Sequence, residues 1–274
     1  MYKIIIMALL IFIGMVGYDN ITDKAQPTTP IQQEQQKVSK HEKSAAMALF
    51  TSLLPPKEEW PSSVHKFYLA FNMDEVIDPI RQNPNWTSLD AMSRDIPQAL
   101  IAIEDHAFYN HGAIAVEGIL RAALANINAG EVVQGGSTLT QQFVKNVFLS
   151  HEQSMERKIE EAVLSLMLED NYSKDEILEL YLNTTYFGAG STGIKQASRT
   201  YFGKAPSALT LAEAAVIASL PYAPTSLNPL ENPEGCKKRQ LLVLAAMHKY
   251  GMINQGQLAE AKTEKIRLTN GTVM

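Results

Sequence analysis

The stretch GGSTLTQQFVKN (135–146) predicts where a central helix begins. Two glycines at its start let the backbone approach a ligand closely. Thr138 and Gln141 have the T-x-x-Q spacing of a capping box, so we expect a helix to start directly after Thr138. A helix N-terminus flanked by the Ser137 hydroxyl attracts anions, and Lys145 shares the face of Gln141. The stretch therefore predicts an anion site, although a capped helix with a surface lysine would also fit.

The stretch IAIEDHAFYNHG (101–112) lies upstream and interrupts an apolar helical stripe with two acids. We expect this helix to begin with Asp95 as its N-cap, and Glu104 follows the apolar Leu100 by one turn. A carboxylate at that edge would be partly desolvated, which disfavours its charged form and makes it a better proton acceptor. The alternative is that Glu104 and Asp105 form a solvated helix end.

The stretch SMERKIEEAVLSLMLED (154–170) predicts an amphipathic helix whose apolar stripe includes Ile159. Arg157 and Lys158 precede Glu161 by four and three residues, so two cations flank one carboxylate on a single face. Such spacing is also typical of a solvated salt-bridge ladder, which contributes little stability.

Two further segments complete the expected secondary structure. SKDEILELYLNTTYFG (173–188) opens with a second capping box, Ser173 and Glu176, and predicts a helix that ends near Asn183 and Gly188. VHKFYLAF (64–71) predicts a short strand. From about residue 86 onward the pattern is helical.

Composition excludes several classes of function. The 274-residue chain carries a net charge of -5, so no general basic field attracts nucleic acid. Its one cysteine, Cys236, allows neither an intrachain disulfide nor a cysteine-based metal cluster, and no H-E-x-x-H spacing occurs. We therefore expect no metal site made of protein side chains.

The N-terminal segment KIIIMALLIFIGMVGY (3–18) has fifteen uncharged residues after Lys3 and no A-x-A-like cleavage site. This length fits either a signal-peptide core or a short membrane span. We favour an uncleaved anchor over residues 1–18, with the N-terminus in the cytoplasm. The polar, Gln-rich residues 19–60 then form a tether.

The order and spacing of these stretches resemble the peptidoglycan glycosyltransferases, which are monofunctional enzymes or modules of class A penicillin-binding proteins. The five family motifs are matched by EDHAFYNHG, GGSTLTQQFVKN, RKIEE, ILELYLN and, with one extra residue, RQLLVLAAM (239–247). The matched positions that we expect to support the site are Asp105, Phe108, His111, Thr140, Asn146 and Asn183.

The resemblance implies an all-α, lysozyme-like fold with a head lobe and a jaw lobe, behind the membrane anchor. The glycosyltransferase domain would cover residues 61–270, with its motifs at 104–247. The apolar segment 113–133 would form the jaw and contact lipid. The enzyme would lie in the cell membrane as a single-pass protein, with its catalytic domain on the extracytoplasmic side.

The resemblance also implies an activity, which is polymerisation of lipid II into β-1,4 glycan strands with release of undecaprenyl pyrophosphate. Glu104 would be the catalytic base, and Glu161 the second acid. The residues expected to bind the pyrophosphate are Ser137, Thr138, Gln141, Lys145, Arg157 and Lys158. No cofactor is required, although a divalent cation, Mg or Mn, could accompany the pyrophosphate.

The expected partners are lipid II, the growing glycan strand, membrane lipid and other cell-wall synthesis proteins, and no nucleic acid. A lytic, lysozyme-like enzyme and a non-catalytic cell-wall scaffold are the alternatives. No K-T-G sequence occurs, so the transpeptidase motif set is incomplete and we expect a monofunctional enzyme. A truncated bifunctional protein would look the same.

Overall fold

The structure is a computed structural model that describes residues 68–115, 117–118, 136–149 and 154–274. These residues are helical and contain no strand, apart from two isolated antiparallel bridges, Tyr186↔Thr192 and Arg267↔Val273. The all-α class is therefore confirmed for the described part of the chain. None of its helices is both long and apolar enough to cross a membrane.

Several predictions fall outside the described residues. These are the anchor over 1–18, the tether over 19–60 and most of the jaw segment 113–133. The division into head and jaw lobes stays a prediction for the same reason. The chain divides into two compact units, Met1–Asn72 and Met73–Met274.

The strand predicted over 64–71 is wrong for the part that the structure describes, because residues 68–71 are helical. The Asn72 backbone N–H donates to the Tyr68 carbonyl at 3.1 Å, and the Asn72 side-chain amide donates to the same oxygen at 2.9 Å. These four-residue contacts close a helical turn. An apolar run this short does not distinguish strand from helix by periodicity alone.

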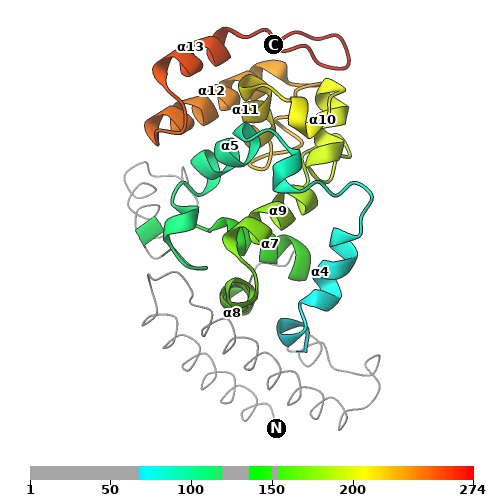
Figure 1. The fold of residues 1–274 in the computed structure, drawn as a ribbon, viewed down its shortest axis with the longest axis vertical. Helices are drawn as coiled ribbons and strands as arrows, with labels where there is room; N and C mark the ends of the chain where they lie inside the picture. Colours follow the sequence, from blue (N-terminus) through cyan, green and yellow to red (C-terminus); the bar gives the residue numbers. More distant parts are fainter. Residues whose placement is uncertain (1–67, 116, 119–135, 150–153) are drawn as a thin grey trace. The chain divides into compact units, whose positions relative to one another are not determined.

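The second unit contains helices of very different length (Figure 1). In chain order they are α4 (Asp74–Arg81), η2 (Leu89–Ala91), α5 (Asp95–Glu104), η3 (Phe108–Asn110), α7 (Leu139–Phe148), α8 (Met155–Asn171), α9 (Lys174–Thr184), α10 (Ile194–Phe202), η4 (Pro206–Ala208), α11 (Leu211–Ser219), α12 (Pro233–Lys249) and α13 (Gln255–Thr263).

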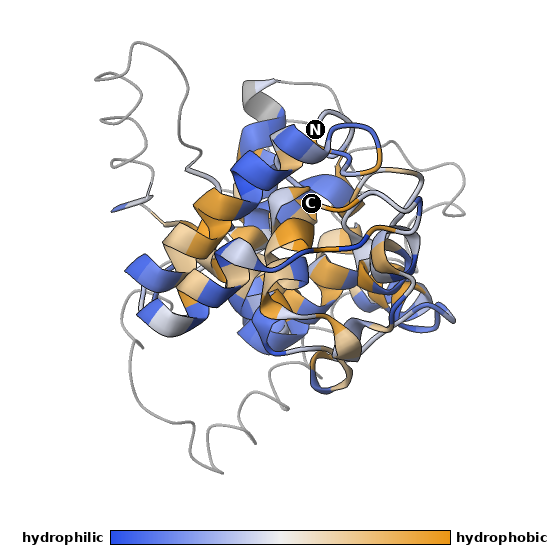
Figure 2. Ribbon diagram, turned by 90° about the horizontal axis from the view of Figure 1, so that it is seen from above, coloured by the Kyte–Doolittle hydropathy of each residue, from blue (hydrophilic) through white to orange (hydrophobic). Residues whose placement is uncertain are grey.

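The core of this unit is built around α11. Every residue of α11 from Ala212 to Ser219 is buried, and the helix packs against both α5 and α12. Small side chains such as Ala99 and Ala102 on the buried face of α5 let the neighbouring helices approach closely. In Figure 2 the hydrophobic segments gather in the middle of the helical assembly, with hydrophilic segments around them.

A second group of helices, α7, α8 and α9, packs through α7. Phe143 and Val144 of α7 are fully buried, as are Ile177 and Leu178 of α9. Both predicted capping boxes are present: Thr138 caps α7 with Gln141, and Ser173 caps α9 with Glu176. The predicted start of each helix and the predicted end of α9 are therefore confirmed.

The start of α5 differs from the prediction by one residue. Arg94 occupies the N-cap position and makes no side-chain capping bond, while Asp95 is the first helical residue. An acid in the first turn still complements the helix dipole, and Pro97 is tolerated there because N–H groups of that turn have no intrahelical partner.

The buried face of α8 also differs from the prediction. Ile159 is 59% exposed, whereas Glu161 is only 2% exposed and lies on the same side as Leu164 and Leu168. The helix is therefore rotated so that it buries a carboxylate in place of an isoleucine. Lys158 makes this possible, because its ammonium forms an ion pair with Glu161.

Asn183 ties the end of α9 to the loop before η2. Its side-chain oxygen accepts from the Thr87 backbone N–H at 2.9 Å, and its side-chain nitrogen donates to the Thr87 carbonyl at 2.8 Å. The same nitrogen donates to the Glu179 carbonyl at 2.8 Å. Asn183 thus satisfies both backbone polar groups of one buried loop residue.

We expect Asn183→Ala to lower the free energy of unfolding by about 2–3 kcal/mol, because it leaves the buried Thr87 N–H and carbonyl unpaired. Urea denaturation of the two proteins measures this difference. Asn146→Ala is the matched control: Asn146 is exposed, and its replacement should change stability by under about 0.5 kcal/mol. Equal losses in the two variants would contradict the role given to Asn183.

Candidate active site

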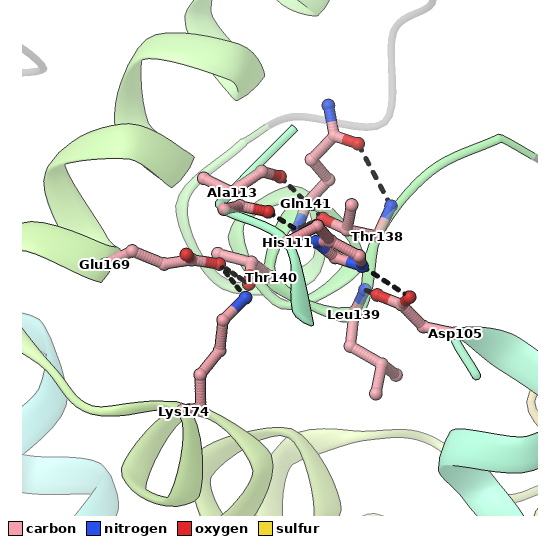
Figure 3. Close-up of polar contacts among 10 residues, drawn as sticks. Asp105, His111, Ala113, Thr138, Leu139, Thr140, Gln141, Glu169 and Lys174 are labelled. Carbon is pink, nitrogen blue, oxygen red and sulfur yellow. Dashed lines mark hydrogen bonds and ion pairs between the residues drawn. The ribbon is translucent and has the colours of Figure 1, made fainter. Parts of the chain in front are cut away.

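Asp105 joins the end of α5 to the start of α7. Its Oδ2 accepts a hydrogen bond from the Leu139 backbone N–H at 3.1 Å, and its Oδ1 contacts His111 Nε2 at 2.7 Å (Figure 3). A carboxylate at a helix N-terminus is stabilised by the unpaired N–H groups there and by the helix dipole. Asp105 therefore serves as an additional cap on α7, which holds the first two sequence motifs together.

Each ring nitrogen of His111 has a hydrogen-bond partner. Its Nδ1 lies 2.6 Å from the Gly112 carbonyl and its Nε2 lies 2.7 Å from the Asp105 carboxylate. A carbonyl and an ionised carboxylate only accept hydrogen bonds, so these two contacts favour the protonated ring. Burial alone would lower the pKa of His111, but the hydrogen bonds to Asp105 and Gly112 and the Asp105 charge together raise it.

The predicted anion site at the N-terminus of α7 already contains a carboxylate of the protein. Besides Leu139 N–H on Asp105, the Gln141 N–H donates to Thr138 Oγ1 at 3.1 Å, and the Thr138 N–H donates to Gln141 Oε1 at 3.0 Å. The Thr138 hydroxyl in turn donates to the Ala113 carbonyl at 2.8 Å. The structure thus places Thr138 and Gln141, both buried, in the capping of α7.

A second paired network lies behind this cap. Thr140 donates to Glu169 Oε1 at 2.5 Å, and Lys174 Nζ lies 2.7 Å from the same oxygen (Figure 3). The Lys174 ammonium also lies 4.4 Å from the centre of the fully buried Phe108 ring. Thr140 and Phe108 are therefore packing and pairing residues that fix α7 against α9.

Glu104, the last residue of α5, faces a different part of α7. Gln142 Nε2 donates to Glu104 Oε2 at 2.9 Å, and the hydroxyl of buried Tyr181 donates to Gln142 Oε1 at 3.0 Å. The tyrosine thereby fixes which end of the Gln142 amide faces the carboxylate. Neither Gln142 nor Tyr181 was singled out from the sequence, because capping boxes identify only their own residues.

The pKa of Glu104 is raised, because burial disfavours its charged form. The hydrogen bond from Gln142 and the positive charges of Arg239 and Lys145 act in the opposite direction, and they are outweighed. Glu104 is therefore a stronger proton acceptor than an ordinary glutamate while two cations remain nearby.

Three cations, in the second and third motifs and on α12, form no ion pair with another described residue. Within the part of the chain that the structure describes, Lys145, Arg157 and Arg239 form no ion pair and no side-chain hydrogen bond, and the Nε atoms of both arginines are buried and unpaired. Lys158 differs, because it pairs with Glu161 and donates to Ser137 Oγ at 3.2 Å. Lys158 thus links α8 to the loop before α7.

The remaining predicted positions are less informative. Asn146 is exposed, and Asn183 has the structural role described above. Cys236 is buried against Ser219, and burial raises the pKa of its thiol to about 11. Among the described residues no group of three or more His, Cys, Asp or Glu side chains could hold a metal ion.

The imidazolium form of His111 makes its contribution to stability depend on pH. Because its pKa is raised in the folded state, the contribution is complete below the unfolded pKa of about 6.5 and is lost as the pH rises through the folded pKa. We expect the difference in unfolding free energy between the wild type and His111→Gln to be larger at pH 5.5 than at pH 9. Denaturant titrations at the two pH values test this, and a difference that grows with pH would contradict it.

Known proteins are similar to this chain over the region that contains the site residues described above. Residues 73–248 match the family model described as Transglycosylase. A protein of Cupriavidus necator assigned to the transglycosylases is 41% identical over 194 residues, which are 71% of this chain and 84% of that protein. Penicillin-binding protein 1A of Neisseria flavescens is 44% identical over 185 residues, 68% of this chain but only 23% of that protein.

A crystal structure of penicillin-binding protein 1A from Haemophilus influenzae is 33% identical, covers 48% of this chain and 16% of that chain, and has a TM-score of 0.34. The chain thus spans most of its Cupriavidus relative and about a quarter or less of the penicillin-binding proteins. The family match covers well over half of the chain and includes Glu104, Asp105, Lys145 and Glu161. The chain belongs to the transglycosylase family, the peptidoglycan glycosyltransferases.

Proposed function

We propose that the protein polymerises lipid II into β-1,4 glycan strands and releases undecaprenyl pyrophosphate. The observation that carries this proposal is the setting of Glu104. One carboxylate of raised pKa is oriented by Gln142 and lies within the fields of Lys145 and Arg239, which form no ion pair with another described residue. A reaction that needs both a base and a site for a leaving anion fits this arrangement.

The chemistry assigned to Glu104 is a single displacement. Glu104 takes the proton from the 4-hydroxyl of the acceptor sugar while that oxygen forms a bond to the anomeric carbon of the donor. The bond from this carbon to the pyrophosphate oxygen breaks, and its electron pair leaves with the pyrophosphate. One displacement inverts the α-linked donor to a β-linkage, as in an inverting glycosidase with a sugar hydroxyl in place of water.

The leaving pyrophosphate would be held by side-chain cations. At the N-terminus of α7 the Leu139 N–H already donates to Asp105, so the proposed binding of pyrophosphate by Ser137, Thr138 and Gln141 would be supported mainly by side-chain cations. Lys145 and Arg157 form no ion pair with another described residue, so their charges are available to an anion. Lys158 pairs with Glu161 and donates to Ser137. We therefore assign to Glu161 the positioning of Lys158, and to the three cations the stabilisation of the departing charge.

A divalent cation, if one takes part, would be bound mainly by the pyrophosphate oxygens. Mg²⁺ commonly binds through substrate phosphates together with one or two carboxylates and water. Among the described acids, Glu161 forms an ion pair with one of the assigned cations, Lys158, and is committed to it. The residues described here do not form a cage for such an ion.

The lytic alternative would also use a glutamate of raised pKa, as a general acid. It would cut a neutral glycan, however, and has no anion to neutralise Lys145, Arg157 and Arg239. A scaffold would need neither the base nor the cations. Incubating the purified full-length protein with labelled lipid II separates the three: a polymerase lengthens glycan, a lytic enzyme shortens added polymer, and a scaffold does neither.

The membrane setting belongs to the same proposal. A lipid-linked substrate requires the catalytic domain to lie at the membrane surface, so we propose a single-pass cell-membrane protein with an extracytoplasmic catalytic domain. Membrane lipid, the growing strand and other cell-wall synthesis proteins are its proposed partners.

Glu104→Gln keeps the size of the side chain and removes the proton acceptor. We expect polymerisation of lipid II to fall by about 10²-fold or more, the usual scale for loss of a general base. Gel analysis of labelled glycan measures the rate, and Glu260→Gln, which changes an exposed acid on α13, should retain wild-type activity. Near-normal synthesis by a folded Glu104→Gln protein would remove Glu104 from this role.

Lys145→Ala and Arg157→Ala should each weaken binding of a lipid-linked pyrophosphate, or of a phosphoglycolipid mimic such as moenomycin, by about 1.5–3 kcal/mol. Because both cations would contact one ligand, the double variant should depart from additivity. Calorimetry on the singles, the double and the exposed control Lys262→Ala measures these effects. Unchanged affinity in both singles would make the cations solvated surface charges, worth under about 1 kcal/mol.

A further inference from the structure

Tyr250 and His106 form an aromatic stack that joins the end of α12 to the segment after Glu104. Their ring centroids lie 4.1 Å apart, and the ring planes are inclined by only 12°. His106 follows Glu104 and Asp105 in the segment between α5 and η3. Tyr250 lies just beyond residues 73–248, which match the family model. One partner of the stack is therefore outside the family match.

The C-terminus of α12 fixes the backbone of Tyr250, which is the C-cap of this helix. Gly251 follows with a φ of +72°, and its N–H donates to the His248 carbonyl at 3.0 Å. The Met252 N–H donates to the Met247 carbonyl at 2.9 Å. These two bonds form a Schellman motif, in which glycine adopts the left-handed conformation at little cost. The helix end itself thus holds Tyr250 in place.

Two successive residues after Glu104 are bound to different helices. Asp105 is bound to the start of α7, and His106 stacks on Tyr250 at the end of α12. Glu104 is the last residue of α5, so no further helical turn follows to hold it. The direction of its carboxylate, which accepts from Gln142 at 2.9 Å, then depends on these two contacts.

The stack lies at the surface of the protein. Tyr250 is 38% exposed, and the Lys249 ammonium lies 5.1 Å from the centre of its ring. A ring this exposed stabilises the fold less than a core side chain does, because less apolar area is removed from water. Stacked rings still have a preferred mutual orientation. We therefore expect the stack to orient its segment more than it stabilises the fold.

We propose that Tyr250 is a positioning residue for the proposed base, Glu104. By stacking on His106 it holds the segment that follows the base, so the carboxylate keeps its orientation toward Gln142. This inference rests on the proposed function. Tyr250 does not contact the substrate in this role, so it affects the rate of the chemical step and not the binding of lipid II. A misplacement of about 1 Å can lower a rate by about 10²-fold.

The test compares polymerisation of labelled lipid II by the full-length wild type, Tyr250→Ala and Tyr250→Phe. In Tyr250→Ala kcat should fall by about tenfold, while KM and moenomycin affinity stay within about threefold. Tyr250→Phe keeps the ring, so its kcat should stay within about threefold of the wild type. Leu242→Ala removes another exposed apolar side chain of α12 and should retain wild-type activity. A larger effect on KM than on kcat would indicate contact with the substrate and overturn the positioning role.

A double-variant cycle tests whether Tyr250 acts through His106. His106→Ala should lower kcat by about as much as Tyr250→Ala, and the double variant should lose about tenfold in total, not about a hundredfold. His106→Phe keeps a ring that can stack, so its kcat should stay within about threefold of the wild type. Additive losses, full activity of Tyr250→Ala, or a His106→Phe protein as slow as His106→Ala would each overturn the proposal.

NMR of histidine-labelled protein separates the stack from the activity. The Tyr250 ring current should shift the His106 ring signals upfield in the wild type and in Tyr250→Phe, and this shift should be lost in Tyr250→Ala. A wild type that shows the shift but makes no glycan would overturn the proposed function and leave the stack as a structural contact. A wild type that makes glycan without the shift would overturn the positioning role alone.

Discussion

The hydrogen bond from the Leu139 N–H to the Asp105 carboxylate is the contact on which the site depends. It fixes the end of α5 against the start of α7, and His111 holds the same carboxylate from the other side. With Asp105 held in this way, the preceding Glu104 faces Gln142, one turn into α7. The two adjacent acids thus have different roles: Asp105 fixes the backbone at the start of α7, and Glu104 stays available for proton transfer.

Local hydrogen bonding explains what could be predicted of the fold. The capping boxes at Thr138 and Ser173 lie within single turns, so they fix the starts of α7 and α9 without help from the rest of the chain. The rotation of α8 could not be predicted in the same way. The apolar periodicity predicted that Ile159 lies on the buried face of α8. Tertiary packing buries Glu161 instead, because Lys158 compensates its charge.

The sequence predicted which types of residue form the site, but it predicted the role of each residue less well. Sequence spacing led to Glu104 and to Lys145, but it favoured Gln141 over Gln142 as a ligand-facing amide. Capping occupies the Gln141 oxygen, and the 100° step between helical neighbours places Gln142 on the Glu104 side. Arg239 begins the fifth matched motif, but its effect on Glu104 follows from the packing of α12 on α5, which no local pattern encodes.

Most polar groups around α7 are paired within the fold, whereas a few buried ones among the described residues are not. Around α7, the groups of Asp105 and His111 find partners within the fold, as do those of Thr140 and Glu169. Elsewhere among the described residues, the Nε atoms of Arg157 and Arg239 and the side-chain oxygens of Thr185 and Gln240 are buried without a hydrogen-bond partner. Folding alone favours pairing every buried donor, since each unpaired one costs about 1–3 kcal/mol. The unpaired Nε of Arg239, whose charge acts on the desolvated Glu104, is therefore better explained by a ligand than by packing.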